Sequence, residues 1–178
     1  MRIISGTHKG RIVHAPTKLP VRPTTDFAKE SIFNILNNHF DFEGLVILDL
    51  FSGTGNITYE FASRGSRSIT SVDDNHNCCD FVKKTIANFK MENIRMYKSD
   101  VFSFLKKEEQ VYDIIFADPP YEMDSEKFQS LPEFVFNKNM LKENGWLIIE
   151  HGERTIFKDH KHFVEHRKYG NVNFSIFK

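Results

Sequence analysis

The sequence predicts an α/β protein whose strands form a doubly wound, mostly parallel sheet of seven strands with an antiparallel hairpin at one edge. Apolar segments of strand length alternate with segments of helical periodicity, and this alternation is typical of parallel sheets covered by helices on both faces. The tail breaks the alternation, because Tyr169-Gly170-Asn171 separates two strand-like segments in the manner of a hairpin turn. The predicted fold class is therefore Rossmann-like, with its last two strands antiparallel at an edge.

The order of elements begins with a small N-terminal β-hairpin, predicted from strand-like residues 2–5 and 11–15 around a glycine-containing turn. Thr25 or Asp26 is the expected N-cap of the first helix, which has an apolar face at helical spacing. Strands are expected at 46–50, 68–73, 94–98, 112–117, 145–150, 162–168 and 172–177, and helices at about 56–64, 76–89, 101–108 and 125–137. We divide the chain into a basic hairpin extension, residues 1–24, and one α/β domain, residues 25–178.

Charge is distributed unevenly along a chain whose net charge is zero. Residues 1–24 hold five basic side chains and no acidic one, whereas the rest of the chain holds 19 basic and 24 acidic side chains. A basic segment on an acidic body is expected for polyanion binding, and a solvated hairpin is the alternative. The basic side chains that we assign to substrate binding are Arg2, Lys9, Arg11 and Arg22.

The remaining composition is that of a soluble globular protein of the cytoplasm. No apolar run approaches the roughly 20 residues that a membrane-spanning helix needs, and the N-terminus has no secretory signal. Cys78 and Cys79 are adjacent, which disfavours a disulfide between them. The histidines near the C-terminus match no metal-binding spacing, and we expect no metal.

A glycine-rich loop follows the predicted strand at 46–50 and reads Asp49-Leu50-Phe51-Ser52-Gly53-Thr54-Gly55. Glycines at a strand-to-helix turn let the backbone approach a ligand closely, and a tight turn is the structural alternative. The third glycine of a dinucleotide-binding fingerprint is replaced by Thr58. Asp49 can accept hydrogen bonds from an ammonium group but repels pyrophosphate, which favours S-adenosylmethionine over NAD. Asp49, Phe51, Gly53 and Gly55 are therefore candidate cofactor-binding residues.

Two further strands end in acidic residues. Asp73 lies about 20 residues beyond the glycine loop, where a carboxylate is well placed to bind both ribose hydroxyls. Asp100 can accept a hydrogen bond from an adenine amino group while the backbone N–H of Val101 donates to the adenine ring. Helix capping is the alternative for each carboxylate, and for Asp100 alone it is the stronger one.

The segment Asp118-Pro119-Pro120-Tyr121 follows the apolar strand at 112–117. A carboxylate and a rigid proline carbonyl can accept from both N–H groups of an exocyclic base amine and direct its lone pair toward an electrophile. Tyr121 offers a face for stacking an extruded base. Asp118, Pro119 and Tyr121 are thus candidate catalytic residues, with Pro120 and Tyr121 also in the substrate pocket. The alternative is a Pro-Pro turn beside an incidental carboxylate.

These motifs resemble those of class I S-adenosylmethionine-dependent methyltransferases that act on exocyclic base nitrogens. Segments 4–11 and 21–34 are similar to signatures of the RsmD family, the 16S rRNA guanine-N2 methyltransferases, as are 145–151 and 167–172. The resemblance implies that the glycines lie against the methionine of the cofactor, Asp73 against its ribose and Asp100 against its adenine. It places guanine at Asp118 and Tyr121, and it places Arg22, Thr24 and Asp26 at the floor of the pocket. Lys29 stands where the family often has Arg, and Asp73 where Glu is commoner.

The expected function is methyl transfer from S-adenosylmethionine to guanine N2 of 16S rRNA, in naked RNA or in an assembling small ribosomal subunit. The target base has to leave its stack or be presented unstacked. We expect a monomer without a membrane partner. An adenine-N6 methyltransferase of DNA or RNA shares Asp118-Pro119-Pro120-Tyr121 and is one alternative, and a non-catalytic RNA-binding module is another. A dehydrogenase is disfavoured by Asp49 and Thr58.

Overall fold

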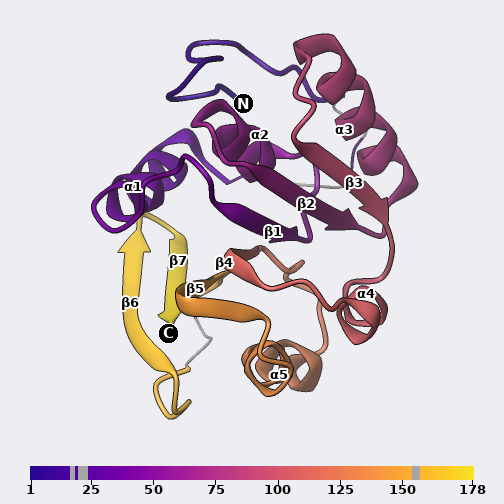
Figure 1. Cartoon of the computed structure of the whole chain (residues 1–178). Helices are drawn as coiled ribbons and strands as arrows, with labels where there is room; N and C mark the ends of the chain where they lie inside the picture. Colours follow the sequence, from indigo (N-terminus) through magenta and orange to yellow (C-terminus); the bar gives the residue numbers. More distant parts are fainter. Residues whose placement is uncertain (17–18, 20–23, 154–156) are drawn as a thin grey trace.

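The computed structural model describes residues 1–16, 19, 24–153 and 157–178. Its strands form one seven-stranded sheet of order β3-β2-β1-β4-β5-β7-β6 (Figure 1). The strands are β1 Val46–Leu50, β2 Ser68–Asp73, β3 Ile94–Lys98, β4 Tyr112–Ala117, β5 Leu141–His151, β6 Phe163–Tyr169 and β7 Val172–Phe177. The helices are α1 Asp26–Asn37, α2 Asn56–Ser63, α3 His76–Phe89, α4 Val101–Lys107 and α5 Ser125–Asn137. Strands β1 to β5 are parallel, and β7 is antiparallel to β5 and β6.

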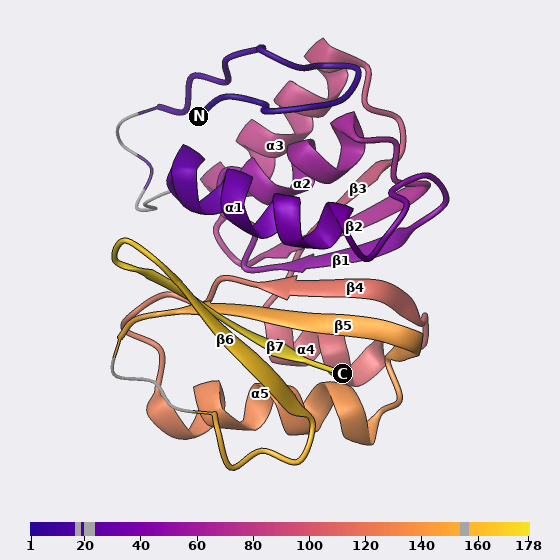
Figure 2. The ribbon, with the colours of Figure 1, turned by 90° about the vertical axis from the view of Figure 1, so that its left-hand side faces the viewer.

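Helices cover both faces of the sheet, with α1, α2 and α3 on one face and α4 and α5 on the other (Figure 2). Alternate residues of each strand supply the two cores, because successive side chains of a strand point to opposite faces. On β1, for example, Ile47 packs in the core under α1 to α3, whereas Leu48 packs in the core with α4 and α5. The predicted doubly wound fold with an antiparallel C-terminal edge is confirmed.

Several expected element ends are off by one residue, and two differences are larger. Strand β5 begins at Leu141 rather than at 145, because Leu141 pairs with Tyr112 before an irregularity shifts the register. The N-terminal segment contains one antiparallel bridge, Arg2 to Ile12, rather than two strands. Its glycine turns satisfy backbone groups locally, for instance from Gly10 N to the carbonyl of Ile3 at 2.8 Å.

This N-terminal hairpin, residues 1–13, packs against α2 and α3 (Figures 1 and 2). Ile3 and Val13 are buried in the core under α1 to α3. The Glu60 carboxylate on α2 accepts from the backbone N–H groups of Ile4 at 2.8 Å and Ser5 at 3.1 Å. A Cβ at Gly6 would lie 1.7 Å from the carbonyl oxygen of Ser63, so only glycine allows this approach. The hairpin is therefore a docked part of the fold, and the domain division at residue 24 stays a prediction.

The parallel register brings the carboxyl ends of β1 to β5 to one edge of the sheet. The order changes direction between β1 and β4, because β2 and β3 lie on one side of β1 and β4 and β5 on the other. In open α/β sheets, ligands bind outside the carboxyl ends of the strands at such a switch point. No helix within the described residues is long and apolar enough to cross a membrane.

Candidate methyl-transfer site at the carboxyl edge of the sheet

The glycine loop connects β1 to α2 in a conformation that few side chains tolerate. Phe51, Gly53 and Gly55 have positive φ values of 58°, 52° and 81°. A Cβ at Gly55 would lie 2.6 Å from the ring of Tyr59, so no larger residue fits without displacing that ring. The loop is hydrogen-bonded to β2, because the backbone N–H of Ser52 donates to the carbonyl of Val72 at 3.0 Å. This bare, fixed backbone is suited to close contact with a cofactor.

Asp73 at the end of β2 binds this loop directly. Its Oδ2 accepts from the backbone N–H of Gly53 at 2.8 Å, and its Oδ1 accepts from that of Asn75 at 2.9 Å. Asn75, not Asp73, is the N-cap of α3, since its side chain accepts from the backbone N–H groups of Asn77 and Cys78. Burial raises the pKa of the Asp73 carboxyl. The capping alternative for Asp73 is thereby removed, and its binding of the ribose stays a prediction.

We expect Asp73→Ala to weaken S-adenosylmethionine binding by about 1–3 kcal/mol, because two ribose hydroxyls would lose their acceptor. Isothermal calorimetry on the purified protein measures this change. Asp74→Ala removes an exposed carboxylate one residue further on and is the matched control. Equal affinities for the Asp73 variant and the wild type would exclude Asp73 from the cofactor site.

Asp49 lies on the buried side of the loop, with 1% of its surface exposed. Its carboxylate accepts from the hydroxyl of Thr58 on α2, which also lies 2.8 Å from the hydroxyl of Ser71. Burial raises the pKa of Asp49 to about 7, although the hydrogen bond from Thr58 lowers it. A buried carboxylate of this kind is best satisfied by a cationic ligand group. Thr58, which replaces the third glycine of the dinucleotide fingerprint, thus holds Asp49.

The free energy of unfolding should fall as pH rises from about 4 to about 7, because Asp49 has an ordinary pKa of 3.8 and a folded pKa of about 7. In that window the folded protein keeps a proton that the unfolded chain has lost, so this stabilisation is complete below 3.8 and absent above 7. Asp49→Asn should remove this contribution, which amounts to roughly 4 kcal/mol over the whole pH window. Urea denaturation at several pH values tests it, and parallel profiles for variant and wild type would contradict it.

Asp100 follows β3 and is the N-cap of α4, since its Oδ1 accepts from the backbone N–H of Ser103 at 2.8 Å. That hydrogen bond lowers the pKa of the carboxyl. The capping alternative is thus present in the structure, and an adenine contact stays a prediction that the exposed carboxylate can still satisfy. Val101 is buried at the first position of α4. Its backbone, rather than its side chain, is the part available to a ligand.

On the other side of the switch point, Asp118 follows β4, and its backbone N–H donates to the carbonyl of Leu50 at 3.3 Å. Burial raises the pKa of its carboxyl well above the usual range, and the neighbouring Glu150 raises it further. The carbonyl of Pro120 is used within the turn, accepting from Met123 N at 2.9 Å. The Tyr121 side chain is 70% exposed. A Cβ at Gly152 would lie 3.3 Å from its ring, so Tyr121 lies beside the end of β5.

Glu150 is a site residue to which the sequence analysis gave no role. It occupies the carboxyl end of β5, which pairs with β4 through Ala117 and Ile149, and 5% of its surface is exposed. Burial raises its pKa to about 7. The hydroxyl of Thr24 donates to its Oε2 at 2.8 Å, and the place of Thr24 at the floor of the pocket stays a prediction. The signal was present in the sequence, because Glu150 is one more acidic residue at a strand end.

Thr24 is held in place by a series of buried hydrogen bonds. Asn56, the first residue of α2, donates through Nδ2 to the carbonyl of Thr24 at 2.9 Å. The buried Lys29 donates to Oδ1 of Asn56 at 2.8 Å and to the carbonyl of Arg2 at 2.6 Å. Its ammonium also lies 3.6 Å from Glu60. Thr24 and the hairpin are thus joined through Asn56 and one buried ammonium group.

Three of the predicted basic residues, Arg2, Lys9 and Arg11, lie on the hairpin. Lys9 and Arg11 are exposed, and the guanidinium of Arg11 lies 4.9 Å from the ring centre of Phe89 on α3. Arg2 is exposed and 3.9 Å from the carboxylate of Asp26. Arg22 lies outside the described residues.

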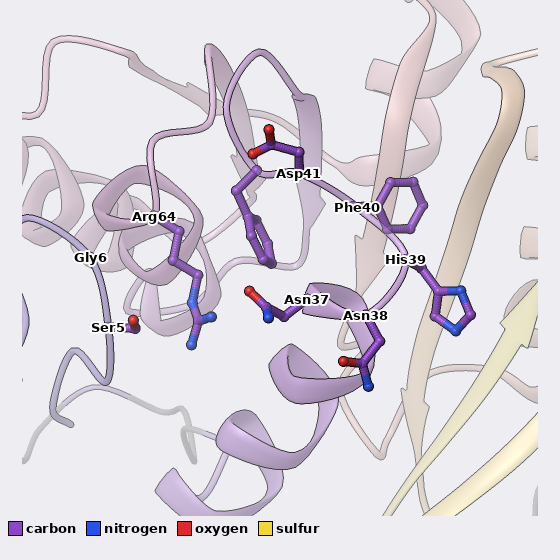
Figure 3. A pocket seen from close by; sticks show the side chains of 9 residues that line it. Ser5, Gly6, Asn37, Asn38, His39, Phe40, Asp41 and Arg64 are labelled. Atoms are coloured by element: carbon purple, nitrogen blue, oxygen red, sulfur yellow. The ribbon is translucent and has the colours of Figure 1, made fainter.

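A hollow of about 610 Å³ lies at the opposite, amino edge of the sheet (Figure 3). It is lined by residues from the hairpin, the end of α1 and the segment before β1, and by Arg64 at the end of α2. The guanidinium of Arg64 already binds Glu60 at 2.9 Å and lies over the rings of Phe33 and Phe42. None of the predicted site residues lines the hollow, which is therefore separate from the candidate site at the carboxyl edge.

The fold and the two-part site at the strand ends together define a class I methyltransferase. The chain belongs to the family described as conserved hypothetical protein 95, the RsmD family, whose sequence model matches residues 1–178.

Two curated relatives resemble the chain over most of their length. It is 36% identical over 155 residues to YlbH of Bacillus subtilis, which covers 85% of this chain and 82% of that protein. It is 32% identical over 150 residues to ribosomal RNA small subunit methyltransferase D of Escherichia coli K12, with coverage of 84% and 71%.

Solved structures show the same fold. The Escherichia coli protein yhhF superposes with a TM-score of 0.85 at 23% identity, covering 99% of this chain and 96% of that one. SMU.776, solved in complex with SAH, has a TM-score of 0.65 at 21% identity and covers 84% of this chain and 49% of its own.

Proposed function

We propose that the protein transfers the methyl group of S-adenosylmethionine to the exocyclic N2 of a guanine in 16S rRNA. The observation that carries this proposal is the arrangement of strand ends around the switch point. The glycine loop, Asp49 and Asp73 lie at β1 and β2, and Asp118, Tyr121 and Glu150 lie at β4 and β5. One side thus offers a cradle for an amino acid and a ribose, and the other offers acceptors for a base amine. The relatives named for rRNA methylation support the choice of RNA as substrate.

The residues present fit S-adenosylmethionine. The glycine loop with its positive φ values, the buried carboxylate of Asp49 and the loop-bound carboxylate of Asp73 suit its backbone contact, ammonium and ribose respectively. When bound, the cofactor supplies an electrophilic sulfonium methyl group. In this proposal Asp100, the N-cap of α4, also accepts from the adenine amino group, and the backbone of Val101 contacts the ring.

Asp118 and the carbonyl of Pro119 accept the two N–H groups of the base amine in this mechanism. The amine is a poor nucleophile because its lone pair is delocalised into the ring, and the two acceptors turn that lone pair out of conjugation. Asp118 stabilises the positive charge that develops on nitrogen. Tyr121 stacks on the extruded base, and Pro120 shapes the wall behind it. The proton leaves the nitrogen after transfer, to Asp118 or to water.

In this proposal the protein is a monomer in the cytoplasm. Its substrate is 16S rRNA, either free or in an assembling small subunit. Arg2, Lys9 and Arg11 bind its phosphates along the docked hairpin. Mass mapping of 16S rRNA from cells that lack the protein tests the proposal. Loss of one N2-methylguanosine is the expected result, whereas an unchanged methylation pattern would overturn it.

We expect the Lys9→Ala, Arg11→Ala double variant to bind RNA more weakly and with a flatter dependence on salt. Each neutralised phosphate contributes to counterion release, so the logarithmic salt slope should fall by about 1 for each phosphate that the variant no longer neutralises. Filter binding at several salt concentrations measures this slope. Lys106→Ala, Lys107→Ala removes the same charge from α4, on the other face of the sheet, and is the control. Equal slopes for the two double variants would exclude the hairpin as the RNA-binding surface.

A further inference from the structure

Two carboxylates, not one, lie at the substrate side of the site. Asp118 directly follows Ala117, which pairs with Ile149, and Glu150 directly follows Ile149. The hydroxyl of Thr24 donates to Glu150 at 2.8 Å, and burial and the nearby Glu150 raise the pKa of Asp118. The two acidic groups therefore lie beside each other at the ends of adjacent parallel strands.

Among the described residues, this pair of carboxylates lacks a cationic partner. No Lys, Arg or His side chain in that part of the chain forms an ion pair with Asp118 or Glu150. Two adjacent carboxylates that are largely removed from water ionise together only at a cost in free energy. Burial and mutual repulsion raise the pKa of Asp118, and burial raises that of Glu150 to about 7. A ligand that presents several N–H donors on one edge would satisfy both carboxylates at once.

Guanine presents such an edge. Its N1–H and the two hydrogens of its N2 amine are three donors in a row, whereas adenine presents an unprotonated N1 beside its amine. Asp118 and the carbonyl of Pro119 account for the two amine hydrogens in the proposed function. Glu150 is then a further acceptor, and N1–H is the donor without a partner. The Tyr121 ring, beside Gly152, lies near the same end of β5 and can hold the base there.

Resting on the proposed function of this site, we propose that Glu150 accepts a hydrogen bond from N1–H of the target guanine and selects guanine over bases with an unprotonated N1. Thr24 fixes the rotamer of Glu150 by donating to Oε2, which leaves Oε1 for the base. Asn56 in turn holds the backbone of Thr24 by donating a hydrogen bond to its carbonyl. Glu150 is a substrate-binding residue in this proposal, and Asp118 remains the residue at the reacting nitrogen.

The test compares two bases at the target position in reassembled small subunits: guanosine and 2-aminopurine riboside. 2-Aminopurine keeps the amine at C2 but has an unprotonated N1. Single-turnover transfer from labelled S-adenosylmethionine is measured for the wild type and Glu150→Gln. The glutamine variant should lower transfer to guanosine about 10-fold to 100-fold, the range for losing one charged hydrogen bond. Transfer to 2-aminopurine should change little, because the glutamine amide can donate to its N1.

The ratio of the two rates is the decisive readout, since a structural defect lowers both rates alike. Glu153→Gln removes a carboxylate three residues further along and should leave the ratio unchanged. An unchanged ratio in Glu150→Gln, with active wild-type protein, would overturn the assignment of Glu150 alone. A wild type that methylates no guanosine would instead overturn the proposed function, and this inference with it.

Discussion

Asp118→Asn should lower the single-turnover rate of methyl transfer about 100-fold or more, the scale for removing one preorganised electrostatic group. Asparagine keeps the shape of the side chain but is a weaker acceptor, and its amide can turn a donor toward the base amine. The loss grows as the nitrogen becomes positive, so the rate should fall more than the affinity for RNA. Small subunits that lack this methyl group, with labelled cofactor in excess, are the substrate for the assay.

The affinity for S-adenosylmethionine should hardly change in this variant, because Asp118 lies across the switch point from the glycine loop. Calorimetry on the same preparation is therefore the control for folding. Near wild-type transfer by Asp118→Asn would contradict the catalytic assignment and leave Asp118-Pro119-Pro120-Tyr121 as a turn that shapes the pocket.

Glu60→Ala should destabilise the fold by about 3–5 kcal/mol, the range for removing one partner of a buried ion pair. The Glu60 side chain is fully buried and binds Arg64 at 2.9 Å, with Lys29 3.6 Å away. It also satisfies two backbone N–H groups of the hairpin. Truncation leaves the buried ammonium of Lys29 without a counter-charge and releases the hairpin. Urea denaturation of the variant and the wild type measures the difference.

Glu165→Ala is the control for this variant, since Glu165 forms a partly exposed pair with Arg167 and should leave the denaturation midpoint near that of the wild type. A Glu60 variant as stable as the Glu165 variant would contradict the anchoring role. In that case the hairpin would be held by the burial of Ile3 and Val13 alone.

Much of the fold could be predicted because its signals are local. Helix α3 was expected at 76–89 and extends over His76–Phe89, and strands β1 to β4 match their expected bounds. Thr25, one of two expected caps, caps α1 through a hydrogen bond to its hydroxyl from Ala28 N. The N-terminal hairpin was harder, because its position depends on Glu60, more than fifty residues away in the sequence. No periodicity within residues 1–13 indicates that contact.

Residues of the candidate site could be predicted from the sequence where the local backbone alone determines the residue type. Gly55 is required by its positive φ and by the ring of Tyr59, and both follow from a tight turn before a helix. Asp100 shows the limit, because a helix cap and an adenine contact require the same carboxylate after a strand. Glu150 shows another limit, since its place beside Asp118 follows from the pairing of β4 with β5 and not from sequence spacing.

The central claim is that the site transfers a methyl group to guanine N2, and identification of the product nucleoside tests it most directly. Small subunits from cells that lack the protein are incubated with the purified wild type and labelled S-adenosylmethionine, and the RNA is digested to nucleosides for mass spectrometry. We predict that the label appears in N2-methylguanosine. Label in N6-methyladenosine, or no label in the RNA, would contradict the account.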